Sequence, residues 1–254
     1  MKEDTPKKRR KTPLSNPSAD PRACTHDTRI TVCGQVPMFA NLTVDQLHQV
    51  VAHCQAHGYE AAQSIFTEGS EATHIYIVAT GAVKTTRVAA DGRESLIDLH
   101  APGDFFGALP ALGRTTYAKT AWTLTPTCVL SLDAREYDYL MAEIPEIAMA
   151  TLRGVAQRLT DSQRTIHMLA GAPLEQRLAA LLIVLANKVG RPWNDRTLLD
   201  VPLSREDLAA MVGVATESVS RLLSQWHRNG WIEAGRRWVA IIDRAALEGL
   251  ENND

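Results

Sequence analysis

The sequence predicts an α+β protein in which a β jelly roll comes first, a long helix follows and a winged helix-turn-helix comes last. Short β-rich runs separated by turn residues occupy 58–133, which is typical of a sandwich or jelly roll. Apolar residues three and four positions apart fill 145–169. Two helical patterns around Gly213 then precede two strand patterns. The expected parts are a disordered basic tail with cysteines (1–33), a β domain (34–144), a long helix (145–170) and a C-terminal domain (171–254).

The composition is that of an ordinary soluble globular protein, with 45% hydrophobic and 22% charged residues. Its 254 residues allow two domains, each with its own core. The formal net charge of −2 does not itself indicate nucleic-acid binding. Such binding depends on the local density of basic residues rather than on the total. Arginines do gather in the C-terminal part, namely Arg221, Arg228, Arg236, Arg237 and Arg244.

Neither a membrane span nor a secretory signal is expected, because no apolar stretch is long enough and none follows the basic run at 7–11. The four cysteines are unevenly spaced, unlike a disulfide framework, so we expect a cytoplasmic protein with reduced thiols. Residues 1–23 contain almost nothing apolar and should be disordered. The basic run is either a non-specific contact with DNA phosphate or a solvated tail, of which we prefer the second.

The β domain should begin with a helix that Thr43 caps, because threonine is a good N-cap residue. The β-rich runs after it are separated by turn residues that include Gly69 and Gly81. Asp91-Gly92 lies between two alternating runs and is a strong hairpin signal.

One face of the long helix has the spacing of an a/d seam between two helices. A helix packed on its own sheet would show similar spacing, so the pattern alone leaves both interpretations open. The seam residues are Leu152, Val155, Leu159, Ser162, Ile166 and Leu169.

The C-terminal domain should start after a hinge at Gly171-Ala172-Pro173. An amphipathic helix is expected at 174–189 and a loop at 190–200. Residues 229–243 predict two short strands around a Gly-Arg-Arg turn, which together would form a wing.

Between the loop and the wing, two short helices should enclose a tight turn. Ser204 is an expected N-cap, with Asp207 three residues later as in a capping box. Gly213 suits the turn, and Thr216 is expected to cap the second helix. The outward face of that helix is either solvated or enters a major groove, where Arg pairs with guanine and Glu with the cytosine amino group. That face carries Glu217, Ser218, Ser220, Arg221 and Gln225, opposite Val219, Leu222, Leu223 and Trp226.

The run from Ser204 to Leu223 resembles the DNA-binding motif of the Crp/Fnr family of bacterial transcription regulators. That family's recognition helix starts Glu-Thr-Val/Ile-x-Arg, and residues 217–221 here read Glu-Ser-Val-Ser-Arg. The Glu-x-x-Ser-Arg form is similar to the FNR branch, whose half-site is TTGAT-like. The resemblance implies a homodimer on palindromic double-stranded DNA, with RNA polymerase as a further partner. It also implies base reading by Glu217, Ser220 and Arg221. The full set expected to contact DNA is Ser204, Arg205, Thr216, Glu217, Ser218, Ser220, Arg221, Gln225, Arg236 and Arg237.

Residues 36–140 resemble the cyclic-nucleotide-binding fold that serves as the sensor in this family. A cyclic-nucleotide pocket in the family has Gly-Glu and then Arg-Ser/Thr-Ala, the Arg pairing the phosphate bidentately. This chain has Gly107-Ala108, and Ala118-Lys119 stands closest to the arginine position. Cyclic AMP is therefore not the expected effector. The matching glycines are Gly69, Gly81, Gly103 and Gly107.

The FNR branch holds an iron–sulfur cluster with an N-terminal cysteine group and one sheet cysteine. The corresponding candidates here are Cys24, Asp27, Cys33 and Cys128. Because an aspartate replaces the family's middle cysteine, we commit to no metal site, and ordinary tail and buried thiols are the alternative. His26 with two of these cysteines could instead hold zinc or haem. Cys54, with His53 and His57, is expected on a helix, partly buried and inert.

Two other classes of protein fit less well. A jelly-roll enzyme of the cupin type needs neighbouring metal-binding histidines, and neither His74 nor His100 has a His-x-His neighbour. We therefore expect no enzyme. A cyclic-nucleotide signalling module would need the missing Glu and Arg. The sequence names neither the effector nor the target genes, and it does not separate activation from repression.

Overall fold

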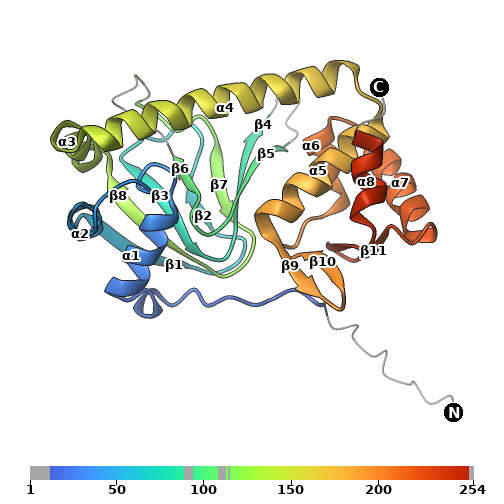
Figure 1. Ribbon diagram of the computed structural model, residues 1–254, viewed down its shortest axis with the longest axis horizontal. Coiled ribbons are helices and arrows are strands. Elements are labelled where there is room, and N and C mark those ends of the chain that lie inside the picture. Colours follow the sequence, from blue (N-terminus) through green and yellow to red (C-terminus); the bar gives the residue numbers. More distant parts are fainter. Residues whose placement is uncertain (1–11, 89–93, 108–112, 114, 252–254) are drawn as a thin grey trace, which may run out of the picture.

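The computed structural model describes residues 12–88, 94–107, 113 and 115–251. A β domain and a helical C-terminal domain lie side by side, and the long helix α4 (Pro145–Gly171) runs along the β domain to the C-terminal domain (Figure 1). The N-terminal segment passes along the opposite side of both domains (Figure 1). The basic run at 7–11 lies outside the described residues.

The β domain consists of two antiparallel sheets, which confirms the predicted jelly roll. Within the described residues the strand orders are β1-β8-β3-β6 and β2-β7-β4-β5. The aromatic side chains of Phe66, Tyr76, Phe106 and Tyr117 stack between the sheets. The strands are β1 (Cys54–Tyr59), β2 (Ser64–Phe66), β3 (His74–Thr80), β4 (Val83–Val88), β5 (Glu94–His100), β6 (Phe105–Gly107), β7 (Thr120–Thr123) and β8 (Thr127–Asp133).

Strands β4 and β5 pair antiparallel from Val83↔His100 to Val88↔Glu94, as a hairpin requires. The turn at Asp91-Gly92 that predicted this pairing lies outside the described residues. Helix α2 (Val44–Ala52) precedes β1 and has the expected Thr43 cap, with Gln46 completing a capping box.

The tail expected to be disordered up to residue 33 is partly folded, which corrects the prediction. Residues 12–20 have no regular secondary structure, η1 (Pro21–Ala23) is a short 3-10 turn and α1 (His26–Gln35) is a helix. Asp20 caps the turn and Thr25 caps the helix. The helix forms because Val32 and Cys33 are both buried in the core shared with α2 and β8. Two adjacent apolar residues were too weak a signal to predict it.

His100, at the end of β5, is a buried histidine inside the β domain. Its ring stacks on Phe106 with centroids 4.9 Å apart, and its Nε2 lies 3.4 Å from Thr85 Oγ1. Burial lowers the pKa of His100 to about 4, against the opposing charge of Asp98. Charges on Lys188 and Arg158 lower the pKa further, whereas Asp104 raises it. The imidazole is therefore neutral at pH 7.

Acidification from about pH 6.5 to about pH 4 should destabilise the protein through His100. In that window the unfolded histidine binds a proton that the folded one does not, so stability falls as pH falls, by up to about 3 kcal/mol. The free energy of unfolding, measured with urea at a series of pH values, should fall as the pH falls through this window. His100→Gln should flatten the slope of that free energy against pH. An unchanged slope in the His100 variant would contradict the assignment.

Helix α4 follows α3 (Ala134–Glu143) and presents two faces. Ile147, Ala150 and Thr151 are buried against the β domain. The seam side is open to solvent, with Leu152 61% exposed, Leu159 60% and Ile166 66%.

Three further positions belong to the predicted seam, and two of their side chains are described. Val155 and Ser162 are also exposed, and the Ser162 hydroxyl donates to the Arg158 carbonyl. Met149, which was not among the predicted seam residues, is also exposed and extends the apolar stripe toward the N-terminus of the helix. The side chain of Leu169 lies outside the described residues.

The C-terminal domain packs helices on a small sheet with strand order β11-β12-β10-β9. The expected loop at 190–200 is instead a hairpin, which corrects the prediction. Asn194 and Asp195 both have positive φ, at 46° and 59°, as a two-residue type I′ turn requires. The elements are α5 (Leu174–Val189), β9 (Gly190–Trp193), β10 (Arg196–Leu199), α6 (Arg205–Val212), α7 (Thr216–Arg228), β11 (Ile232–Gly235), β12 (Trp238–Ile241) and α8 (Arg244–Glu251).

The two domains share a hydrophobic cluster in which Leu96 and Leu99 of β5 join the C-terminal core. Lys84 Nζ lies 3.2 Å from Asp207 Oδ1 at the start of α6. Lys188 Nζ of α5 lies 3.0 Å from Asp104 Oδ2. The β4–β5 hairpin is therefore the surface on which the C-terminal domain rests.

Candidate nucleic-acid interface

Helix α6 begins with the predicted capping box. The Asp207 backbone amide donates to Ser204 Oγ (3.0 Å), and the Ser204 amide donates to Asp207 Oδ2 (2.8 Å). Burial acts to raise the pKa of Asp207, but hydrogen bonds from Ser204 and the charge of Lys84 outweigh it, so that pKa lies below its usual value. The first turn of α6 is thus held by both local and interdomain contacts.

The turn between α6 and α7 is made by Gly213, whose φ of 69° lies in the left-handed region. The prediction that Thr216 caps the second helix is wrong. The N-cap of α7 is Ala215, without a side-chain cap bond, and Thr216 is the first residue of the helix. Helix α7 thus starts one residue earlier than predicted, and Thr216 lines a hollow with Arg236 and Arg237.

Replacing Gly213 with Ala should destabilise the C-terminal domain by about 1–2 kcal/mol, because an L-residue is strained in the left-handed region. Thermal unfolding should show the loss. Gly249 of α8 offers a matched control, since a Cβ there meets nothing within 4 Å. Gly249→Ala should be neutral or slightly stabilising. Equal effects of the two substitutions would argue against backbone strain at Gly213.

Helix α7 divides into the two faces expected from the sequence. Its apolar side is buried, with Trp226 1% exposed. On the other side Glu217, Arg221 and Gln225 are exposed. Ser218 and Ser220 are half-buried on the flanks of that face.

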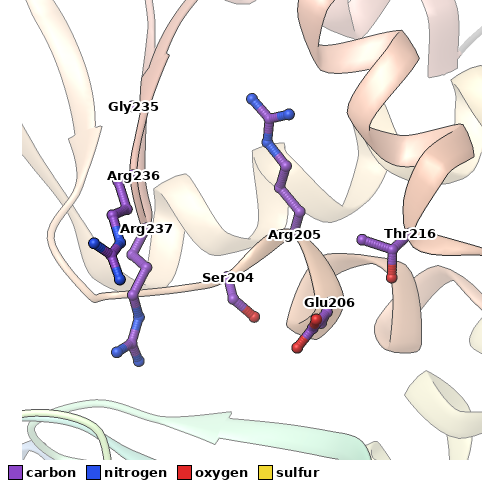
Figure 2. Close-up of a pocket in the computed structure, with 7 residues that line it drawn as sticks. All are labelled: Ser204, Arg205, Glu206, Thr216, Gly235, Arg236 and Arg237. Carbon is purple, nitrogen blue, oxygen red and sulfur yellow. The ribbon is translucent and has the colours of Figure 1, made fainter.

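Two adjoining hollows lie over this surface. Figure 2 shows the first, with the wing arginines on one side, Thr216 on the other and the first turn of α6 between them. Its lining residues are Ser204, Arg205, Glu206, Thr216, Gly235, Arg236 and Arg237. The second is lined by Arg205, Ser220, Arg221, Ser224 and Arg228.

The two hollows bring together most of the residues predicted to contact DNA. Arg205 belongs to both, so that the two form one continuous basic surface across α6, α7 and the wing. Ser224 was missed by the sequence analysis, although it lies one helical turn after Ser220. A cationic surface with an exposed polar helix in its middle fits phosphates and base edges.

Comparisons with known proteins match both domains. Residues 56–143 match the cyclic nucleotide-binding domain family, and residues 176–250 match the Crp-like helix-turn-helix domain family. The chain belongs to the Crp/Fnr family of transcription regulators. It is therefore a DNA-binding regulator of this type, and the relatives found are regulators rather than enzymes.

Individual relatives are distant but nearly full-length. The chain is 27% identical over 216 residues to a CRP-like cAMP-activated global transcriptional regulator of Mycobacterium tuberculosis, covering 85% of this chain and 96% of that protein. It is 25% identical over 216 residues to the transcriptional activator FnrA of Stutzerimonas stutzeri, covering 85% and 87%.

Solved structures show the same fold. FixK2 from Bradyrhizobium japonicum superposes with a TM-score of 0.70 at 24% identity, over 79% of this chain and 98% of that one. A CRP-family regulator from Thermus thermophilus has a TM-score of 0.65 at 28% identity, over 77% and 96%.

The nucleotide cassette of the family can be placed only in part. Gly107 ends β6 with φ of 115°, and residues 108–112 and 114 lie outside the described residues. Burial acts to raise the pKa of Asp98, but His100, Lys188, the Leu99 amide and, least of these, Lys119 lower it below its usual value. Lys119 is the residue nearest to the arginine position of the cassette.

The structure separates Asp27 from the three cysteines that accompany it in the candidate metal set. Asp27 is exposed on α1, whereas Cys24, Cys33 and Cys128 are buried in one core. Cys54 joins them, on β1 rather than on the expected helix. Across the described part of the chain, no group of three or more His, Cys, Asp or Glu is arranged to hold a metal ion.

His26, the other candidate ligand, is turned away from the cysteines. Its Nε2 lies 3.0 Å from Nδ1 of His48, and the two rings stack. The structure therefore does not bring Asp27 or His26 together with the cysteines as one ligand set. Among the described helices none has the length and apolar character to cross a membrane.

Proposed function

We propose that the protein is a homodimeric regulator that reads a palindromic, TTGAT-like site in double-stranded DNA. The observation that carries this proposal is the polar face of α7, where Glu217 stands one turn before Ser220 and Arg221. Further arginines lie around this face, namely Arg205, Arg228, Arg236 and Arg237. Glu accepts from the cytosine amino group, and Arg donates two hydrogen bonds to guanine. The Glu-x-x-Ser-Arg order and the FnrA relative favour the FNR branch.

The dimer would form through the exposed apolar seam of α4. A two-fold axis along this helix would present two recognition helices about one turn of DNA apart, which explains why the site should be a palindrome. The basic residues around α7 would hold phosphates, so affinity should fall steeply with salt.

Control would come from the β domain, because the C-terminal domain rests on the β4–β5 hairpin. A change there would shift α6 and α7 together. RNA polymerase would be the second partner and the cytoplasm the place of action, as for a regulator that acts on chromosomal DNA.

The test is a binding isotherm on a duplex with the sequence TTGAT-N4-ATCAA and on a duplex of equal composition with scrambled half-sites. We expect binding to the palindrome to be tighter by about tenfold or more, with a stoichiometry of two chains per duplex. Equal affinity for both duplexes would refute the site, and one chain per duplex would refute the dimer.

A further inference from the structure

The N-terminal segment at residues 12–23, here called the strap, binds the C-terminal domain. The Ser15 amide and hydroxyl donate to the Asp200 carboxylate at 2.7 and 2.6 Å. Arg191 Nη2 donates to the Pro13 carbonyl at 2.5 Å, and Arg191 Nε donates to the same Asp200 at 2.7 Å. The strap is therefore hydrogen-bonded to the β9–β10 hairpin at the end away from its turn.

The same strap also binds the β domain. Thr80 Oγ1 donates to the Ser18 carbonyl at 2.9 Å. The strap crosses β1 so closely at Gly58 that a Cβ there would overlap the carbonyl oxygen of Ala19. Gly58 stands opposite Cys128 in the sheet. The strap thus links the two domains and crosses the β domain beside a cysteine.

The strap leads directly into Cys24, which lies beside Cys128 in the buried core of the β domain. Cys24 is 5% exposed and Cys128 2%. Burial, and then the neighbouring Cys24, raise the pKa of Cys128 to about 12. Both cysteines are free thiols in this structure.

A second thiol pair lies deeper in the same core. Cys33 lies beside Cys54 in that core, and this neighbour together with burial raises the pKa of Cys33. The Cys54 thiol also donates to the Val50 carbonyl at 3.3 Å. Helix α1 holds Cys33 at 0% exposure.

Arg29 lies between the two pairs. Its Nε donates to the Cys24 carbonyl (3.1 Å), and its Nη1 donates to the Cys54 carbonyl (3.3 Å). Its charge acts to lower the pKa of both Cys33 and Cys128. A fixed guanidinium is the kind of neighbour that favours a thiolate, the reactive form of cysteine.

We infer that Cys24 and Cys128 are an oxidisable pair that reacts with a hydroperoxide and closes into a disulfide, tying the strap to β8. The Cys24 thiolate attacks the hydroperoxide, the O–O bond breaks, and the alcohol leaves after taking a proton. The Cys128 thiol then attacks the sulfenic sulfur of Cys24, forming the S–S bond and releasing water. Two thiols and one hydroperoxide give one disulfide, one alcohol and one water. No step depends on DNA binding.

The strap makes this pair, rather than Cys33 and Cys54, the reactive one. Cys24 follows η1, a three-residue turn with no buried residues, so local opening of this turn exposes the Cys24 thiol more readily than unfolding of α1 would expose Cys33. Exposing Cys33 would require α1 to leave the core. After oxidation the disulfide holds the end of the strap against β8. The hydrogen bonds between Ser15 and Asp200 should then open less often.

The experiment treats the reduced full chain with hydrogen peroxide, alkylates the remaining thiols under denaturing conditions and maps peptides without reduction. We expect the Cys24–Cys128 linked peptide to dominate, with Cys33 and Cys54 alkylated. Hydrogen exchange at 12–23 should slow by about tenfold or more on oxidation and recover with dithiothreitol. Cys24→Ser should abolish both changes, while Cys54→Ser should retain them.

Wild-type peptide mapping alone decides the chemistry, so the inference does not depend on how well a variant folds. A dominant Cys33–Cys54 link, links between chains, or Cys24 oxidised to sulfinic acid without a link would each overturn it. If the Cys24–Cys128 disulfide formed without slower hydrogen exchange in the strap, the claim that it ties the strap to β8 would be refuted.

Discussion

Arg221→Ala should weaken binding to the specific duplex by roughly 1–3 kcal/mol, a factor of about 5 to 150 in Kd. Arg221 is exposed on the outward face of α7 and lines a hollow with Arg205 and Arg228. Removing a bidentate partner of guanine also removes the penalty for a wrong base there. Isotherms on four duplexes that differ only at the half-site guanine should therefore differ for the wild type and converge for the variant.

The matched control is Arg236→Ala, which removes an exposed arginine from the wing turn. A phosphate contact carries no sequence information, so affinity should fall equally for all four duplexes. The slope of log K against log salt should become shallower by about one. If Arg221→Ala behaved like this control, Arg221 would hold phosphate and another residue would read the base.

The parts of the fold that short-range signals specify could be predicted from the sequence. Ser204 with Asp207 marks a helix start, and Gly213 marks a turn that only glycine adopts without strain. The apolar side of α7 follows from a 3.6-residue period and is buried as expected. These signals lie within one or two turns of the element that they define.

The hairpin of β9 and β10 shows where such signals are too weak. Asn194-Asp195 suits a type I′ turn, but each flanking strand has only four residues and Pro192 stands in one of them. Pairing with β12 stabilises the hairpin, and that contact is distant in sequence. Helix α1 is a similar case, because burial of Cys33 depends on α2 and β8.

The candidate site divides in the same way. The residues of α7 were predictable because one helix presents them together. The convergence of Cys24, Cys33, Cys54 and Cys128 was not, since η1, α1, β1 and β8 bring them together through tertiary contacts. Local spacing favoured Asp27 as a fourth partner, but the turn of α1 directs it to solvent.

Leu159→Glu should separate the proposed dimer. Leu159 is 60% exposed in the single chain and lies near the middle of the α4 seam. At a two-fold interface the substitution acts twice, because both copies lose an apolar contact and the two carboxylates face each other. Loss of two leucine side chains from the interface alone corresponds to roughly 3 kcal/mol or more, so the dimer Kd should rise by about 100-fold or more. Sedimentation equilibrium would measure it.

Thr160→Glu is the control, because it adds the same charge to the next residue, about 100° around the helix. Thr160 is exposed and its hydroxyl only donates within the helix, to the Ala156 carbonyl. This variant should remain dimeric and bind the palindrome as the wild type does. Leu159→Glu should keep the helix content and lose most palindrome affinity, since a monomer engages one half-site at a time. If the Leu159→Glu variant remained a dimer, the interface would lie on another surface. If the variant were monomeric and still bound the palindrome as the wild type does, DNA recognition would not require the dimer.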